Sequence, residues 1–156
     1  MSQDTPAARL KALGLELPKA PVPAGNYVPF ILEGSLLFLS GQLPYTPEGV
    51  LIYPGKVGES VTLEEANLAA RQCALNILAQ AQAALGDLGR IRQIVRLNGY
   101  VAAAPDFTDT PLVMNGASDL LAEVLGEAGR HTRVAVGVAS RPRRAVVEID
   151  AVIAVK

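Results

Sequence analysis

The sequence predicts an α+β fold in which a mixed β-sheet is covered by two long helices on one face. Strand-like and helix-like segments follow one another in the order β-β-α-β-α-β-β, which is typical of helices packed on a mixed sheet. Half of the 156 residues are apolar and only 19% are charged, so the chain can bury a sizeable core. The length corresponds to about one domain.

The N-terminal part begins with a short helix that precedes a hairpin. Thr5 and Pro6 are an N-cap residue and a first-turn proline for a helix that ends near Gly14. Two β-rich runs, Tyr27–Leu32 and Leu36–Ser40, are joined by three residues that include a glycine, which suits a tight hairpin. A loop or a weak hairpin, rich in glycine and proline, follows them.

The first long helix and a strand occupy the centre of the chain. Thr62 and Glu65 form a capping box, because each side chain can bond the backbone N–H of the other residue. An apolar stripe rich in small residues then continues to Gly86, a suitable residue to end a helix. Residues 91–102 are expected to form a strand.

The second long helix and two further strands complete the chain. Thr110, which is followed by a proline, is the expected N-cap of a helix that reaches Gly126. Residues 132–139 and 145–155 are β-rich and are separated by a proline-containing turn at 140–144. We expect these last two strands to pair as a hairpin.

Both faces of the last strand are apolar, which bears on assembly. One face carries Val147, Ile149, Ala151, Ile153 and Val155, and the other includes Val146, Val152 and Ala154. Two helices cover only one face of the sheet, so another copy of the chain is the simplest cover for the second face. The N-terminal segment folding back is the alternative.

Composition excludes several classes of function. The net charge of −1 argues against a protein that holds nucleic acid through a basic surface. Cys73 and His131 are the only residues of their types, so neither a disulfide nor a usual His/Cys metal site is expected. The first segment has no apolar core of a secretory signal, and no apolar run is long enough to span a membrane, so we expect a cytoplasmic protein.

The expected final hairpin contains a candidate binding site. If its turn has an even number of residues, Arg133 and Glu148 lie on one face, beside the small residues Ala135 and Gly137. A guanidinium and a carboxylate would then line a gap in which a small anionic molecule could bind. The same pattern also fits a structural ion pair without chemistry.

The C-terminal segment resembles the signature of the RidA family of reactive-intermediate deaminases, also called the YjgF family. Residues 132–139, a proline three residues on, and Val147-Glu148-Ile149 carry the resemblance. Further matches in the family's order, among them Asn26-Tyr27-Val28 and Ser40-Gly41-Gln42-Leu43-Pro44, extend it over residues 25–156. Residues 1–24 are then an N-terminal extension of a divergent, longer member.

The resemblance implies a chorismate-mutase-like fold that forms a homotrimer with ligand clefts between subunits. It implies hydrolysis, without a cofactor, of reactive enamines and imines such as 2-aminoacrylate to 2-keto acids and ammonia. Arg133 matches the family arginine that grips the substrate carboxylate, and Glu148 matches the glutamate that positions the attacking water. The matching pocket residues are Tyr27, Ser40, Gly41 and Asn115.

Departures from the family pattern leave the substrate and the activity open. His131 stands where a proline or a small residue is usual, Arg141 replaces a customary apolar residue, and Ala135 occupies the place of a cysteine. A binder of small carboxylates such as 2-ketobutyrate, without turnover, is the first alternative to a deaminase. An endoribonuclease is the second, although its only support here is the arginine-rich turn.

Overall fold

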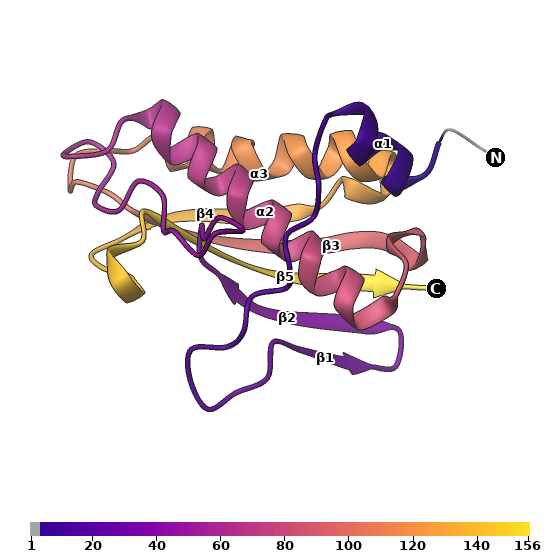
Figure 1. Cartoon of the computed structure of the whole chain (residues 1–156). Helices are drawn as coiled ribbons and strands as arrows, with labels where there is room; N and C mark the ends of the chain where they lie inside the picture. Colours follow the sequence, from indigo (N-terminus) through magenta and orange to yellow (C-terminus); the bar gives the residue numbers. More distant parts are fainter. Residues whose placement is uncertain (1–3) are drawn as a thin grey trace.

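The computed structural model describes residues 4–156 and confirms the α+β class (Figure 1). The helices are α1 (Pro6–Ala12), α2 (Leu63–Leu85) and α3 (Thr110–Leu125), with 3-10 turns η1 (Leu88–Arg90), η2 (Gly126–Gly129) and η3 (Pro142–Arg144). The strands are β1 (Phe30–Glu33), β2 (Leu36–Gln42), β3 (Ile91–Ala102), β4 (Thr132–Val138) and β5 (Val147–Val155). Residues 1–3 of the expected N-terminal extension lie outside the described residues.

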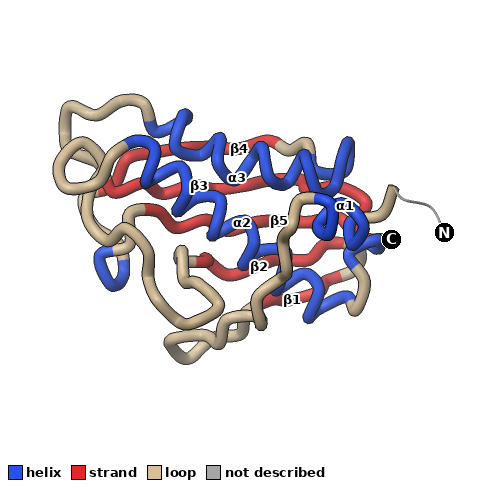
Figure 2. Tube along the Cα trace, turned by 45° about the horizontal axis from the view of Figure 1, so that its top comes forward, coloured by secondary structure: helices blue, strands red, loops and turns tan. Residues whose placement is uncertain are grey.

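The strands form one mixed sheet in the order β1-β2-β5-β3-β4. Only β4 runs parallel to its neighbour, β3, and the other pairs are antiparallel. Both long helices lie over the same face of the sheet (Figure 2), as expected from the sequence. The alternate residues of β5 that start at Val147 are buried in the core beneath these helices.

Local signals determine where the helices begin and end. The capping box is present, because Glu65 N–H donates to Thr62 Oγ1 and Thr62 N–H donates to Glu65 Oε1. Gly86 ends α2 in the left-handed conformation, with φ 77°. Helix α3 begins one residue earlier than expected, with Asp109 as its N-cap residue. None of the helices within residues 4–156 is long and apolar enough to cross a membrane.

Small residues let the long helices approach each other and the sheet. A Cβ atom added to Gly116 of α3 would lie 2.0 Å from the carbonyl oxygen of Asn67 on α2. At Gly99 of β3 an added Cβ would lie 2.3 Å from the sulfur of Met114. At Gly116 the neighbour is helix backbone, so only glycine permits this distance between the two helices. At Gly99 the neighbour is the flexible Met114 side chain, which packs directly on the strand.

The expected final hairpin is wrong. Strands β4 and β5 do not pair, because β3 lies between them and bonds to both. Leu97 of β3 is opposite Arg133 on β4, whereas Tyr100 is opposite Glu148 on β5. Because side chains alternate between faces along β3, Arg133 lies on the helix-covered face and Glu148 on the open face. The connection between β4 and β5 is long enough to pass over β3. A prediction based only on the residues around the turn does not reveal this crossing.

The expected first strand is also displaced. Tyr27 and Val28 precede β1, which begins at Phe30. Pro29 has no N–H to donate, although its carbonyl accepts from the N–H of Ser40 at 2.9 Å. Regular pairing with β2 therefore starts only after this proline.

From residue 4 onward, the N-terminal segment does not cover the open face of the sheet. Helix α1 packs against α3 on the helical layer, with Leu10 in the core. The extended chain that follows crosses α2, where Gln80 Nε2 donates to the carbonyl of Pro21 at 2.7 Å (Figure 2). The open face consequently keeps Phe38 at 44% and Val136 at 45% exposure.

We predict that Gly116→Ala lowers the free energy of unfolding by about 1 to 3 kcal/mol, because the new methyl group meets helix backbone. Gly137→Ala is the matched control, since a Cβ there would meet its nearest neighbour, Ala103 Cβ, at 3.6 Å, an ordinary contact. We expect it to change stability by no more than about 0.5 kcal/mol. Urea denaturation of both variants measures the difference, and equal losses would contradict the proposed close approach.

Candidate functional site

Glu148 lies against a β-bulge in the neighbouring strand. The register between β2 and β5 shifts between Leu39 and Gln42, so Ser40 and Gly41 form the bulge. A Cβ atom added to Gly41 would lie 2.2 Å from Glu148 Oε1. The carboxylate thus occupies the space that a side chain at position 41 would need.

Burial makes the Glu148 carboxyl a weaker acid. Its side chain is half-buried, and desolvation raises its pKa above the ordinary value. The positive charge of Arg141 opposes this rise in pKa, and the negative charge of Asp150 adds to it. A carboxyl group whose pKa is raised is better suited to take up and return a proton near neutral pH.

Tyr27 and Ser40 are grouped with Gly41, the glycine beside the Glu148 carboxylate. They line, together with Gly41, a small pocket of about 60 Å³. Ser40 Oγ donates to the carbonyl of Val28 at 2.8 Å, which ties the chain before β1 to the bulge. Tyr27 is 52% exposed. Glu148 does not line this pocket, so Gly41 is the residue that links the pocket to the carboxylate.

Arg133 lies elsewhere, between β4 and α3. Its Nη1 donates to Ser118 Oγ at 2.9 Å and its Nη2 donates to the carbonyl of Pro111 at 3.1 Å. Asn115 lies between these two residues on α3, four positions after one and three before the other, so all three share one helix stripe. Arg133 and Asn115 therefore form a second group.

A series of hydrogen bonds through Ser118 and His131 fixes the position of the Arg133 side chain. His131 Nδ1 is 2.6 Å from the carbonyl of Gly129, which can only accept, so this nitrogen carries the proton. His131 Nε2 then accepts from Ser118 Oγ at 2.9 Å, and Ser118 in turn accepts from Arg133. Desolvation is the main cause that lowers the pKa of His131, and the Arg133 charge lowers it further. A neutral imidazole is therefore part of the support for this guanidinium.

One protomer does not bring Arg133 together with Glu148. The two residues lie on opposite faces of the sheet, with β3 between their strands. No ion pair joins them among the residues that the structure describes, so the structural pair considered from the sequence is wrong. Each group is one half of a possible site: an arginine and an amide in one, a carboxyl and a glycine backbone in the other.

The open face also holds a polar network that the sequence analysis did not identify. Asn98 Nδ2 donates to Asp150 Oδ1 at 2.7 Å, and Arg96 Nε donates to Asn98 Oδ1 at 3.2 Å. The Tyr100 hydroxyl donates to Asp150 Oδ2 at 3.5 Å. Alternation along residues 91–102 could have placed Arg96, Asn98 and Tyr100 on one face, but not beside Asp150. Desolvation, followed by the Asp150 charge, raises the pKa of Tyr100.

Two other sequence expectations concern cysteine and metal. Cys73 is fully buried in α2, and burial raises the pKa of its thiol. Among residues 4–156 no group of three or more His, Cys, Asp or Glu side chains is arranged to hold a metal ion.

We predict that the His131 network makes stability depend on pH. Because the folded state lowers the pKa of His131, the unfolded chain binds more protons as the pH falls below the ordinary value of 6.5. The free energy of unfolding should therefore fall between about pH 7 and pH 5. His131→Gln cannot titrate, so its decline over this range should be shallower in urea denaturation. Parallel curves for the two proteins would contradict this role of His131.

Comparison with known proteins relates the chain to a family. The family described as "YjgF/chorismate mutase-like, putative endoribonuclease" matches residues 7–150. The chain is 49% identical to protein TCP17 of Trypanosoma cruzi over 94% of this chain and 92% of that protein. The crystal structure of Atu1372 from Agrobacterium tumefaciens, a protein of unknown function, is 51% identical with a TM-score of 0.89 and covers 98% of this chain and 93% of its own.

More distant structures carry functional names. RidA from the Antarctic bacterium Psychrobacter sp. is 27% identical with a TM-score of 0.62, and E. coli TdcF with bound serine is 27% identical with a TM-score of 0.64. Each alignment covers 88% of this chain and 94% of the other. The chain, with its chorismate-mutase-like α+β fold, therefore belongs to the YjgF family.

Proposed function

We propose that this protein hydrolyses reactive enamines and imines, of the 2-aminoacrylate type, to 2-keto acids and ammonia without a cofactor. The observation that carries the proposal is the half-buried Glu148 carboxyl, with its raised pKa, set against the backbone of Gly41. Such a group can hold a water molecule and exchange protons with it. The resemblance to RidA deaminases supports this chemistry.

The reaction needs only an oriented water and a proton shuttle. Glu148 accepts a proton from water while the water oxygen bonds to the imine carbon, and it returns that proton to the imine nitrogen to give a neutral carbinolamine. Glu148 then takes the hydroxyl proton and passes it to the amino nitrogen as the C–N bond breaks, so ammonia leaves and the carbonyl of the 2-keto acid forms. The imine carbon is already electrophilic, so positioning and acid–base terms supply the catalysis.

Arg133 is the proposed partner of the substrate carboxylate. A guanidinium has five N–H donors, and the hydrogen bonds to Ser118 and Pro111 leave others for a bidentate contact. Asn115 on the same stripe adds an amide. The bound serine in the TdcF neighbour is an amino acid, which agrees with a ligand that bears a carboxylate.

A second copy of the chain would complete the site. The open face carries exposed apolar side chains around the Asn98–Asp150 network, a composition that suits an interface. We propose a homotrimer in which Arg133 and Asn115 of one subunit face Tyr27, Ser40, Gly41 and Glu148 of the next. The cleft between subunits then contains both halves.

Two other functions remain alternatives. A binder of small carboxylates would use Arg133 in the same way but would lack turnover. An endoribonuclease is named in the description of the matching family. His131 is the single histidine, and both of its ring nitrogens contact protein atoms, so it offers no histidine pair for phosphodiester cleavage.

The direct test is imine hydrolysis with imines generated in situ from amino acids by an oxidase. We predict that the protein accelerates 2-keto acid release and that two variants fail differently. Arg133→Lys keeps the positive charge but loses the planar guanidinium that can donate two parallel hydrogen bonds to a carboxylate. We therefore expect kcat/KM to fall about tenfold or more. Glu148→Gln loses the proton acceptor, so kcat should fall while affinity for 2-ketobutyrate is kept or improves.

Three results would be decisive here. If the protein accelerates hydrolysis of no imine but binds 2-ketobutyrate in a way that depends on Arg133, it is a carboxylate binder and not a deaminase. RNA cleavage without imine hydrolysis would favour the endoribonuclease. If both variants lost stability while turnover per folded molecule stayed the same, the site assignment would be wrong.

We also predict that inactive subunits complement each other. Arg133→Ala and Glu148→Gln proteins, mixed at equal amounts after unfolding and refolding, should recover about one quarter of wild-type activity, because a quarter of the clefts combine both intact halves. Light scattering should give about three times the protomer mass of 16.3 kDa. A protomer-sized particle, or no recovery on mixing, would contradict a site shared between subunits.

A further inference from the structure

Arg141 is a buried cation with unpaired hydrogen-bond donors within residues 4–156. The residue is 9% exposed, and its Nε and Nη1 atoms are buried with no hydrogen-bond partner among the described residues. A guanidinium stays charged in proteins, so leaving its donors unpaired costs free energy. This arrangement is stabilised when an anion supplies the missing acceptors.

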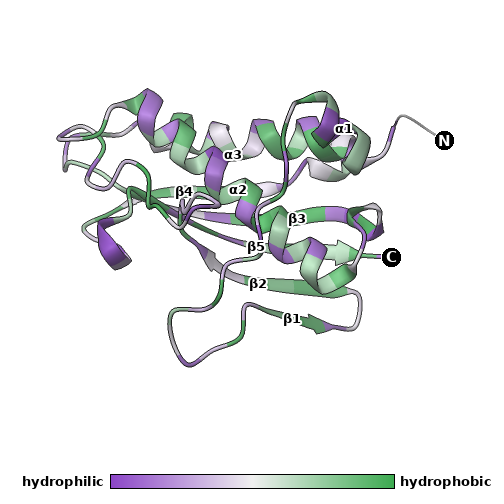
Figure 3. Ribbon diagram, in the orientation of Figure 1, coloured by the Kyte–Doolittle hydropathy of each residue, from purple (hydrophilic) through white to green (hydrophobic). Residues whose placement is uncertain are grey.

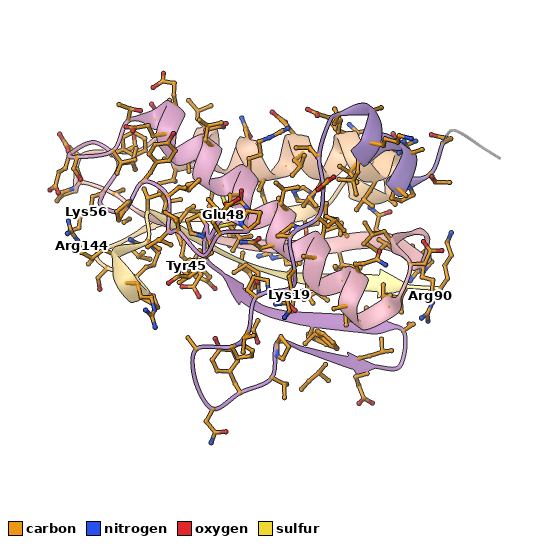
Figure 4. All side chains as sticks on the ribbon, viewed as in Figure 1. Lys19, Tyr45, Glu48, Lys56, Arg90 and Arg144 are labelled. Atoms are coloured by element: carbon orange, nitrogen blue, oxygen red, sulfur yellow. The ribbon has the colours of Figure 1, made fainter. Side chains whose placement is uncertain are left out.

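The guanidinium belongs to the wall of a pocket that is rich in positive charge. The pocket has a volume of about 150 Å³ and is lined by Lys56, Arg141 and Arg144, with Glu59 as its one acidic residue. Ser60 adds a hydroxyl. Figure 4 shows Lys56 and Arg144 at the same end of the molecule. A small anion is therefore the ligand whose charge fits.

The backbone around this pocket is held in an uncommon conformation. Arg143 and Arg144 in the turn at η3 both have positive φ angles, 56° and 59°, which residues other than glycine rarely adopt. Gly55 N–H donates to the carbonyl of Arg144 at 2.8 Å, which joins the turn to the opposite loop. The turn is coloured as strongly hydrophilic in Figure 3. Strain of this kind is typical of ligand-binding loops.

Arg141, in the wall of this pocket, lies within electrostatic range of the candidate catalytic carboxyl. Arg141 and Glu148 are close enough for each charge to act on the other, although they form no ion pair among the described residues. Glu148 therefore does not satisfy the unpaired donors of Arg141. A ligand that reaches from Glu148 toward the turn would meet the guanidinium where it lines the pocket.

We propose that Arg141, with Lys56 and Arg144, binds a second carboxylate of the substrate, so that the preferred substrates are dicarboxylic 2-imino acids. The proposal rests on the hydrolase function inferred above for Glu148 and Arg133. Arg133 of the neighbouring subunit holds the carboxylate next to the imine carbon. Arg141 holds the distal carboxylate, and a monocarboxylic substrate leaves its donors unpaired.

The test compares three variants in binding and in turnover. Arg141→Leu restores the apolar residue customary in the family, Arg141→Lys keeps the charge, and Arg143→Leu is the control because this arginine is exposed and does not line the pocket. Succinate, acetate and inorganic phosphate are the binding probes in calorimetry. Imines made by oxidases from aspartate and from alanine are the substrates.

We expect wild-type protein to bind succinate at least tenfold more tightly than acetate, and Arg141→Leu to abolish that preference. The ratio of kcat/KM for the aspartate imine over the alanine imine should fall at least tenfold in Arg141→Leu, partly in Arg141→Lys, and not in Arg143→Leu. An unchanged ratio, or binding of phosphate without succinate, overturns the proposal.

Failure of this proposal is distinguishable from failure of the proposed function. Efficient hydrolysis of the alanine imine with no Arg141-dependent preference leaves the hydrolase standing and removes the dicarboxylate site. If neither imine is hydrolysed, both the hydrolase function and the proposed preference for dicarboxylic substrates are wrong.

Discussion

The position of β3 between β4 and β5 is the constraint on which the rest of the structure depends. It makes β3 the partner of both strands, so residues opposite each other across three strands share a face. Arg133 consequently faces α3 and Glu148 faces away from the helices. A site that uses both residues must then involve two protomers, because an arginine on one face of a sheet cannot reach a carboxylate on the other.

Close packing of the helical layer maintains this separation. Gly116 allows the two helices to approach where any larger residue would collide with helix backbone, and Gly99 lets the flexible Met114 side chain pack directly on the strand. The layer buries one face along the central strands, and α1 and the extended chain after it add to the same side. The other face carries exposed apolar side chains around the hydrogen-bonded pair of Asn98 and Asp150. Protein–protein interfaces have a similar composition, with apolar side chains and a few hydrogen-bonded polar groups.

Charge on the open side is arranged around Glu148. Asp150 is next along the same face and is bonded by Asn98 and Tyr100, while Arg141 approaches from the strained turn. Opposing charges thus leave desolvation as the largest influence on the Glu148 pKa. Chemistry that needs a reversible proton acceptor benefits from this balance, because a fully paired carboxylate would be too weak a base.

Sequence alone determined the local elements of this protein. The capping box at Thr62, the glycine at position 86 and the alternation along 91–102 are encoded within a few residues, and the structure agrees with each. Only the tertiary structure decided which strands are neighbours, and with that the separation of Arg133 from Glu148 and the support of Arg133 by Ser118 and His131. The physical reason is that the hydrogen bonds of helix caps and turns are made with atoms a few residues away. Backbone hydrogen bonds between strands, by contrast, are the same for every sequence. Which strands become neighbours therefore depends on how the side chains of the whole chain pack.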